Sequence, residues 1–115
     1  MSEPTIDPAT YDELKDTAGA EFVAELVDTF LAEAPRLLDE LCQAYAKRNA
    51  DVFRRSAHSL KSNSNTFGAH ALAAMAKELE LGGFAPVVKA NGEPLNALEQ
   101  EYERVAAALT ELRNA

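Results

Sequence analysis

His58 is the residue of this chain whose type and surroundings are best suited to chemistry. It lies in the stretch RRSAHSLKSNSNTFGA, residues 54–69, and Lys61 follows it three positions later. A neutral imidazole is a nucleophile near neutral pH without a helper base. A phosphoryl group on His58 would add about two negative charges to the surface, and the Lys61 ammonium, one helical turn away, would stabilise them.

The stretch around His58 is predicted to be helical, with the imidazole turned away from the core. At about 100° per residue, one side of this helix collects the residues assigned to the core, namely Phe53, Ala57, Leu60, Ser64 and Phe67. His58 lies roughly 140° from the centre of that side. The residues within about 60° of it are Asp51, Arg54, Arg55, Lys61, Ser62 and Asn65. We therefore expect His58 on the outer surface, ringed by cations on a chain whose net charge is −8.

The neighbours of His58 suggest a surface that a partner protein approaches. Arg54 and Arg55 would add a weaker, longer-range positive field, and the small Ser62 and Asn65 would leave room for another protein's backbone. Residues 62–66 are all poor helix formers and together cost about 3 kcal/mol relative to alanine. We expect the helix to continue through them, held by the packing of its core side.

Hydrophobic residues recur at helical spacing along the whole chain, and no stretch alternates convincingly at period two. Residues 1–10 are predicted as an extended lead-in and residues 11–16 as a short helical turn. The next apolar positions are Phe22, Val23, Leu26, Val27, Phe30, Leu31, Leu37, Leu38, Leu41 and Tyr45. Pro35 removes a backbone donor within this pattern, so we expect a kink or break near residues 33–34.

The second half of the chain predicts three further helices. Asn49 is expected to cap a helix over residues 50–67, and Gly68 to form a tight junction with the next helix, over residues 69–81. The segment GGFAPVVKANGEP is the clear loop, and the last helix follows Pro94. The apolar positions of these last two helices are Leu72, Met75, Ala76, Leu79, Leu81, Leu95, Leu98, Tyr102, Val105, Leu109 and Leu112.

The predicted fold class is all-α: an antiparallel four-helix bundle with a short N-terminal helical segment. We expect a single domain over residues 1–115, with the bundle at about 11–113. The acidic charge argues against nucleic acid and anionic membranes as partners. No apolar run approaches the ~20 residues of a membrane span, and the start of the chain does not resemble a signal peptide. The single Cys42 excludes an internal disulfide, is expected to be buried, and fits the cytoplasm.

The sequence resembles the histidine-containing phosphotransfer (HPt) domain family. The family pattern is approximately A-H-x-L-K-G-S-S-x-x-x-G-A, and residues 57–69 read AHSLKSNSNTFGA. The flanking stretches FVAELVDTFLAEAPRLLDEL and LAAMAKELE also resemble the family's helices, so that the likeness covers about residues 11–112. Two positions depart from the pattern: Ser62 stands where the family usually has glycine, and Asn63 replaces the following serine.

The resemblance implies a phosphocarrier without catalytic machinery of its own. His58 would accept a phosphoryl group from the aspartyl phosphate of a response-regulator receiver domain, Lys61 would steady it, and another receiver aspartate would take it. The implied partners are receiver domains and a hybrid sensor histidine kinase. Mg²⁺ is expected in the receiver, and no cofactor or metal on this chain, which we expect to be a monomer. A free-standing module is expected, with a segment of a larger kinase as the alternative.

Two other interpretations are open. Di-iron bundles use Glu-x-x-His pairs on facing helices, but the residue three positions before His58 is Arg55, and the residue three positions before His70 is Phe67. We expect His70 to be solvated. The alternative to a phosphocarrier is a non-catalytic helical adaptor bundle that docks a signalling partner; it would leave the pairing of His58 and Lys61 to chance. The acidic positions interpreted as a solvated face without a function are Glu99, Glu101 and Glu103.

Overall fold

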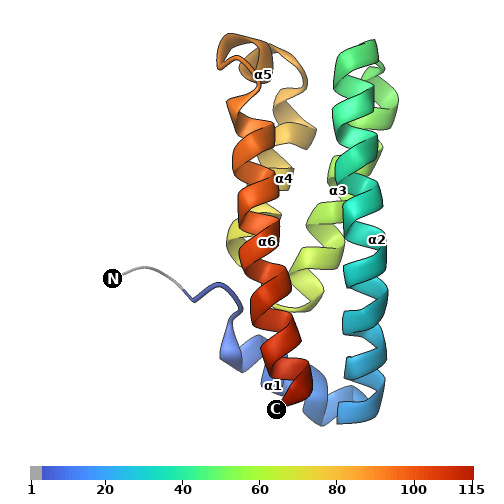
Figure 1. Cartoon of the computed structure of the whole chain (residues 1–115), viewed down its shortest axis with the longest axis vertical. Coiled ribbons are helices and arrows are strands. Elements are labelled where there is room, and N and C mark those ends of the chain that lie inside the picture. Colours follow the sequence, from blue (N-terminus) through green and yellow to red (C-terminus); the bar gives the residue numbers. More distant parts are fainter. Residues whose placement is uncertain (1–3) are drawn as a thin grey trace.

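Residues 4–115 are described by a computed structural model, in which they form six helices and no strand (Figure 1). The part of the predicted extended lead-in at residues 1–3 lies outside the described residues, and residues 8–10 are helical instead, because Asp7 caps a helix that begins at Pro8. The helices are α1 (Pro8–Ala18), α2 (Ala20–Lys47), α3 (Ala50–Thr66), α4 (His70–Gly82), α5 (Ala85–Lys89) and α6 (Glu93–Asn114).

Four long helices, α2, α3, α4 and α6, lie side by side and alternate in direction, while α1 lies at one end of the bundle and α5 at the other (Figure 1). The α3 and α4 helices form a hairpin, and α3 also packs along α2. The predicted antiparallel four-helix bundle with a short N-terminal helical segment is therefore confirmed.

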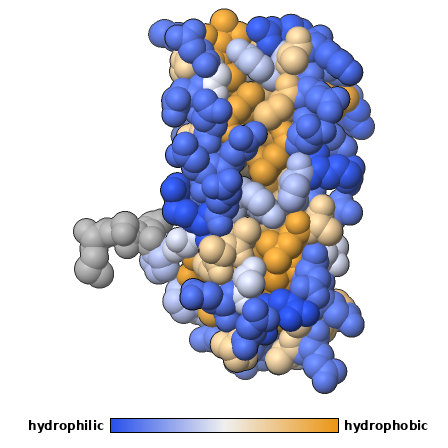
Figure 2. Space-filling view, viewed as in Figure 1, coloured by the Kyte–Doolittle hydropathy of each residue, from blue (hydrophilic) through white to orange (hydrophobic). Residues whose placement is uncertain are grey.

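The core is formed by one apolar side of each long helix. All five residues assigned to the core side of α3 are buried, namely Phe53, Ala57, Leu60, Ser64 and Phe67. The Ser64 hydroxyl donates to the Leu60 carbonyl at 2.7 Å, which satisfies a polar group enclosed in the core. On the opposite side of the molecule from the α3–α4 hairpin, a strip of hydrophobic residues follows the line where α2 and α6 meet, with hydrophilic residues on both sides (Figure 2).

Three positions of the predicted apolar pattern are exposed instead: Phe22, Leu81 and Leu112. Each lies in the first or last turn of its helix, where the neighbouring helices no longer cover it. Hydrophobic periodicity alone does not show where the neighbouring helices stop covering a side chain.

Of the kink or break expected near Pro35, the break does not occur, because α2 runs without interruption for 28 residues. Pro35 itself is exposed, while Ala34, Leu37 and Leu38 are buried beside it. The packing of the whole helix therefore outweighs a local cost of about 3 kcal/mol for a proline in a helix interior.

The ends of α3 agree closely with the sequence prediction, whereas the loop before α6 does not. The Asn49 side chain accepts a hydrogen bond from the Val52 backbone N–H at 3.2 Å and caps α3, as predicted. The segment predicted as a plain loop contains the short helix α5. Gly and Pro residues on both sides of this single turn concealed it.

Gly68 joins the α3–α4 hairpin to the start of the chain. Its φ of +78° is in the left-handed region, and a Cβ atom there would lie 2.8 Å from the Cβ of Thr10. The Gly68 carbonyl accepts a hydrogen bond from the Asp7 backbone N–H at 2.9 Å. The predicted tight junction is confirmed, and the contact explains why glycine suits it.

Candidate functional site

The α3 helix presents His58 on its exposed side, and the α4 helix supplies the ring's polar partner. The His58 side chain is 55% exposed, and its Nδ1 atom lies 2.8 Å from Oε2 of Glu80. The antiparallel pairing of α3 with α4 brings these residues together across 22 positions of sequence. The contact therefore depends on tertiary packing.

Glu80 also contacts Lys61 and so links the two residues singled out in the sequence. Its side chain is only 15% exposed, its Oε1 atom is buried, and the Lys61 Nζ atom lies 3.1 Å from Oε1. The contact with the Lys61 ammonium, together with the hydrogen bond from His58, holds the pKa of the Glu80 carboxyl below its ordinary value, although partial burial opposes this. Glu80 is therefore a carboxylate at neutral pH.

The charge of Glu80 determines the tautomer of a neutral His58. A carboxylate only accepts hydrogen bonds, so the Nδ1 atom must carry the proton and donate it to Oε2. The Nε2 atom then holds the lone pair. The arrangement provides a nucleophilic nitrogen on an exposed ring and a negative charge on the opposite side of that ring.

Lys61 lies on the same side of α3 as His58, but its ammonium contacts Glu80. The Lys61 side chain is only 25% exposed. The three side chains thus form one connected cluster, which we call the His58–Glu80–Lys61 cluster.

The two arginines near His58 are also paired. Arg54 and Arg55 both contact Asp51, at 2.9 Å and 3.1 Å, and all three side chains are more than half exposed. The expected ring of cations is therefore largely balanced by carboxylates, so its field at His58 is weaker than the sequence suggested. The sequence placed Asp51 on this face of the helix, where its spacing allows both contacts, but it could not show the contact of Lys61 with Glu80 of α4.

The small residues Ser62 and Asn65 are exposed on α3 beyond His58. Within residues 4–115 their side chains make no hydrogen bond with each other or with the cluster. They leave that surface free of large side chains.

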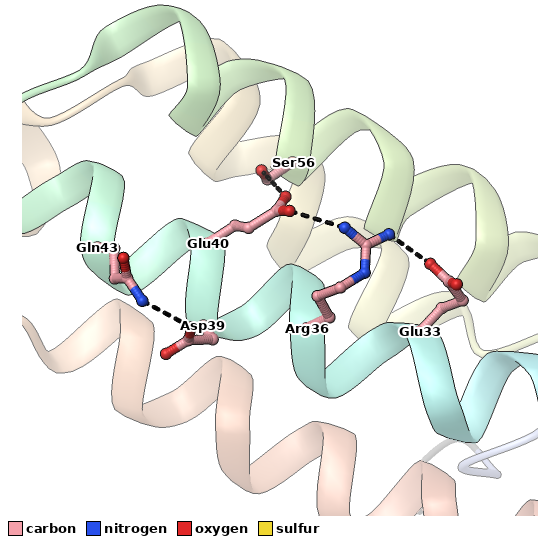
Figure 3. Close-up of polar contacts among 6 residues, drawn as sticks. All are labelled: Glu33, Arg36, Asp39, Glu40, Gln43 and Ser56. Carbon is pink, nitrogen blue, oxygen red and sulfur yellow. Dashed lines mark hydrogen bonds and ion pairs between the residues drawn. The ribbon is translucent and has the colours of Figure 1, made fainter.

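A polar network lies along α2 and reaches α3 (Figure 3). The Ser56 hydroxyl of α3 donates to Glu40 at 3.1 Å, and Arg36 donates to both Glu40 and Glu33. Arg36, Glu40, Ser56 and His58 line a hollow of about 590 Å³ between α2 and α3. We call it the α2–α3 hollow.

Glu80 is the site residue that the sequence reasoning missed. It ends the stretch LAAMAKELE, which was noted only as a helix flanking the motif. An acidic residue on the helix antiparallel to α3 was the available signal, but the register between the two helices was needed to use it.

Outside the His58–Glu80–Lys61 cluster, the structure tests the predictions for Glu101, His70 and Cys42. Glu101 is buried and pairs with Arg104 at 2.7 Å, so the prediction that it belongs to a solvated face is wrong. His70 is exposed, as expected, with its Nε2 atom 3.3 Å from Asp7. Cys42 is half-buried, and burial, with the nearby Glu99 carboxylate, raises the pKa of its thiol to about 11, so the thiol stays protonated at neutral pH.

Between residues 4 and 115, no three His, Cys, Asp or Glu side chains lie close enough together to hold a metal ion. None of the helices in this range is long and apolar enough to cross a membrane.

The chain is similar to known proteins of one family. A family model described as "Hpt domain" matches residues 25–115. The chain belongs to the Hpt domain family. It is 29% identical over 79 residues to the sensor protein TorS of Escherichia coli strain K12, which covers 69% of this chain but only 9% of that protein.

A solved structure extends the likeness to the whole fold. Histidine-containing phosphotransfer protein B (HptB) from Pseudomonas aeruginosa PAO1 matches with a TM-score of 0.87 and 27% identity, over 98% of this chain and 97% of the other. The family predicted from the motif around His58 is confirmed. This Hpt chain therefore has a histidine phosphotransfer role in a phosphorelay.

Proposed function

We propose that His58 is the phosphoryl acceptor of this Hpt protein, and that Glu80 and Lys61 assist it. The observation that carries the proposal is the 2.8 Å contact between His58 Nδ1 and the Glu80 carboxylate on an exposed ring. It supports Nε2 as the nucleophile. His70, the other histidine, lies at the start of α4 and contacts Asp7 instead.

The phosphoryl group would come from the aspartyl phosphate of a receiver domain. The Nε2 lone pair attacks phosphorus, an N–P bond forms, and the P–O bond to the aspartate breaks, so that the aspartate leaves as a carboxylate. The ring keeps its Nδ1 proton and becomes positively charged, and the Glu80 carboxylate stabilises that charge. Transfer to a second receiver aspartate reverses these steps.

Lys61 is proposed to stabilise the phosphoryl group once it is attached. Its ammonium, now 3.1 Å from Glu80, lies one helical turn from His58 and can contact a phosphoryl oxygen by a change of side-chain torsions. An ammonium ~4 Å from such an oxygen contributes between about 1 and 4 kcal/mol, depending on exposure. The Lys61 ammonium would then contact both the Glu80 carboxylate and the phosphoryl group.

The surrounding residues are proposed to meet the receiver. Arg54 and Arg55 lie before His58 on α3, and Ser62 and Asn65 lie after it, all exposed. The receiver would supply most of the catalysis, including a bound Mg²⁺ ion that neutralises charge on the phosphoryl oxygens. This chain is proposed to need no cofactor of its own and to lack catalytic machinery of its own.

The source of the phosphoryl group is proposed to be a hybrid sensor histidine kinase, through its receiver. Similarity to a sensor protein supports this assignment. We propose that the Hpt protein works as a monomer in the cytoplasm. A half-buried, protonated Cys42 is compatible with that compartment.

The test is transfer from a radiolabelled phosphorylated receiver domain to the purified protein. The wild-type chain should take up an acid-labile, alkali-stable phosphate, and His58→Gln should take up none. His70→Gln is the matched control and should be labelled like the wild type. Label retained by His58→Gln would overturn the assignment, and a wild-type chain that no receiver labels would favour a non-catalytic adaptor.

A further inference from the structure

A second hollow lies beside His58, on the side of α3 that faces α4. It has a volume of about 430 Å³, and its lining includes the apolar side chains of Phe53, Leu81 and Phe84. The rings of Phe53 and Phe84 pack edge to face, with centroids 5.0 Å apart, and form its floor. We call it the α3–α4 hollow.

Leu81 stands at the rim of the α3–α4 hollow with 74% of its surface exposed, more than any other large hydrophobic residue in the described part of the chain. Gly82 and Gly83 follow it; a Cβ atom on Gly82 would lie 3.1 Å from the Pro86 side chain, whereas one on Gly83 would meet nothing within 4 Å. The rim is therefore open at Gly83, where an incoming side chain could approach the two rings.

The α3–α4 hollow is continuous with the His58–Glu80–Lys61 cluster. Glu80 both lines the hollow and accepts the His58 hydrogen bond. Arg54, also in its lining, precedes His58 by four residues, about 6 Å along the helix. A stable interface covers about 800 Å² on each partner, a patch roughly 30 Å across. A protein centred on His58 therefore covers this hollow as well.

Of the two hollows beside His58, the α3–α4 hollow alone is lined by phenylalanine side chains. In the α2–α3 hollow, Arg36, Glu40 and Ser56 already satisfy one another (Figure 3). In the α3–α4 hollow, exposed Leu81 and the aromatic floor have a rim of mutually paired charges, Asp51 and Arg54. An apolar centre with a polar rim is the usual organisation of a protein interface.

We infer that the α3–α4 hollow is a docking site for an apolar side chain of the receiver domain that exchanges phosphate with His58, and that Leu81 is a specificity-determining contact. The inference rests on the proposed function. It adds a binding surface that is distinct from the reacting groups. Burying Leu81 and the floor in the complex removes apolar surface from water and favours receivers with a matching apolar side chain.

The experiment compares Leu81→Ser with Phe22→Ser, a matched control because Phe22 is an exposed hydrophobic residue, 51% exposed, in the first turn of α2. The first probe is the phosphorylated receiver domain that labels His58 fastest in the transfer experiment. The second is phosphoramidate, a small donor without a docking surface, whose P–N bond breaks with loss of ammonia as the N–P bond to His58 forms.

With the receiver, Leu81→Ser should lower kcat/KM about tenfold, mainly through KM, while Leu81→Met and Phe22→Ser stay within twofold of wild type. Labelling by phosphoramidate should be unchanged in all variants. Receiver kinetics of Leu81→Ser within twofold of wild type would overturn the docking site and leave the proposed function intact. A matching loss with phosphoramidate would also overturn it, because the effect would then lie in the reacting groups. If no receiver labels the wild type, the proposed function fails, and the docking site with it.

Discussion

The tautomer of His58 is set by a residue of another helix. His58 and Lys61 share one face of α3 because they are three residues apart, so their proximity could be predicted from the sequence. Glu80 could not be found in the same way, since its distance from His58 depends on how α3 and α4 pack. The sequence therefore predicted two members of the cluster and missed the residue that connects them.

Glu80→Gln should slow phosphoryl transfer to His58 about tenfold, equivalent to about 1.4 kcal/mol in the barrier. The amide can still accept the Nδ1–H hydrogen bond, but it lacks the charge that stabilises a positively charged ring. Single-turnover transfer from a phosphorylated receiver measures the rate, and ¹⁵N NMR of the imidazole reports which nitrogen carries the proton. Glu80→Ala should also weaken the preference for the Nδ1–H tautomer.

The control for this prediction is Glu78→Gln, which changes an exposed glutamate of the same helix that makes no ion pair within residues 4–115. Its transfer rate should equal that of the wild type. Equal rates for the Glu78 and Glu80 variants would contradict the role of the carboxylate.

At the scale of helices, local sequence signals predicted most boundaries, and packing explains the exceptions. Asn49 precedes α3 and caps it with its side chain, and Gly68 follows α3 with a left-handed backbone conformation that suits glycine. Pro35 does not interrupt α2, because the stability of this helix comes from burial along its 28 residues. The α5 turn was missed because five residues are too few to display a period.

Gly68→Ala should destabilise the protein by about 1–3 kcal/mol from backbone strain, with an added cost from the clash with Thr10. Thermal unfolding followed by circular dichroism measures the change. Gly92→Ala is the matched control: its φ is +80°, but a Cβ atom there meets nothing within 4 Å. Gly68→Ala should therefore unfold at a lower temperature than Gly92→Ala, and the reverse order would show that the contact with Thr10 is unimportant.

At the scale of the whole molecule, an ion pair links the first half of α2 to the end of α6. Arg113 donates to both carboxylate oxygens of Asp28, at 2.6 Å and 2.8 Å. These hydrogen bonds lower the pKa of the Asp28 carboxyl. The pair is 85 residues apart in sequence, and nothing in the local patterns of either helix indicated it.

The Asp28–Arg113 pair predicts a pH-dependent contribution to stability. Because the pKa of Asp28 is lower in the folded state, the contribution is present above the value of an unfolded aspartate, about pH 4, and is lost as the pH falls through the folded value. Asp28→Asn should therefore lower the Tm at pH 7, and the difference from wild type should shrink below about pH 4.

The same measurement on Asp16→Asn provides the comparison, since Asp16 is exposed and makes no ion pair within residues 4–115. Its Tm should follow that of the wild type at both pH values. A Tm difference for Asp28→Asn that persists unchanged at pH 3 would show that the pair contributes by contacts other than its charge.

His58 lies on the exposed side of a single helix, with a hollow on each side, and this position limits the order in which receivers can bind during the relay. A single exposed imidazole can be reached by one receiver domain at a time, so the donor must leave before the acceptor binds. In each turnover, the phosphorylated protein is then free in solution, without a bound receiver, before the acceptor binds. An abundant receiver that binds at His58 without exchanging phosphate would slow signalling, because it blocks access to the imidazole.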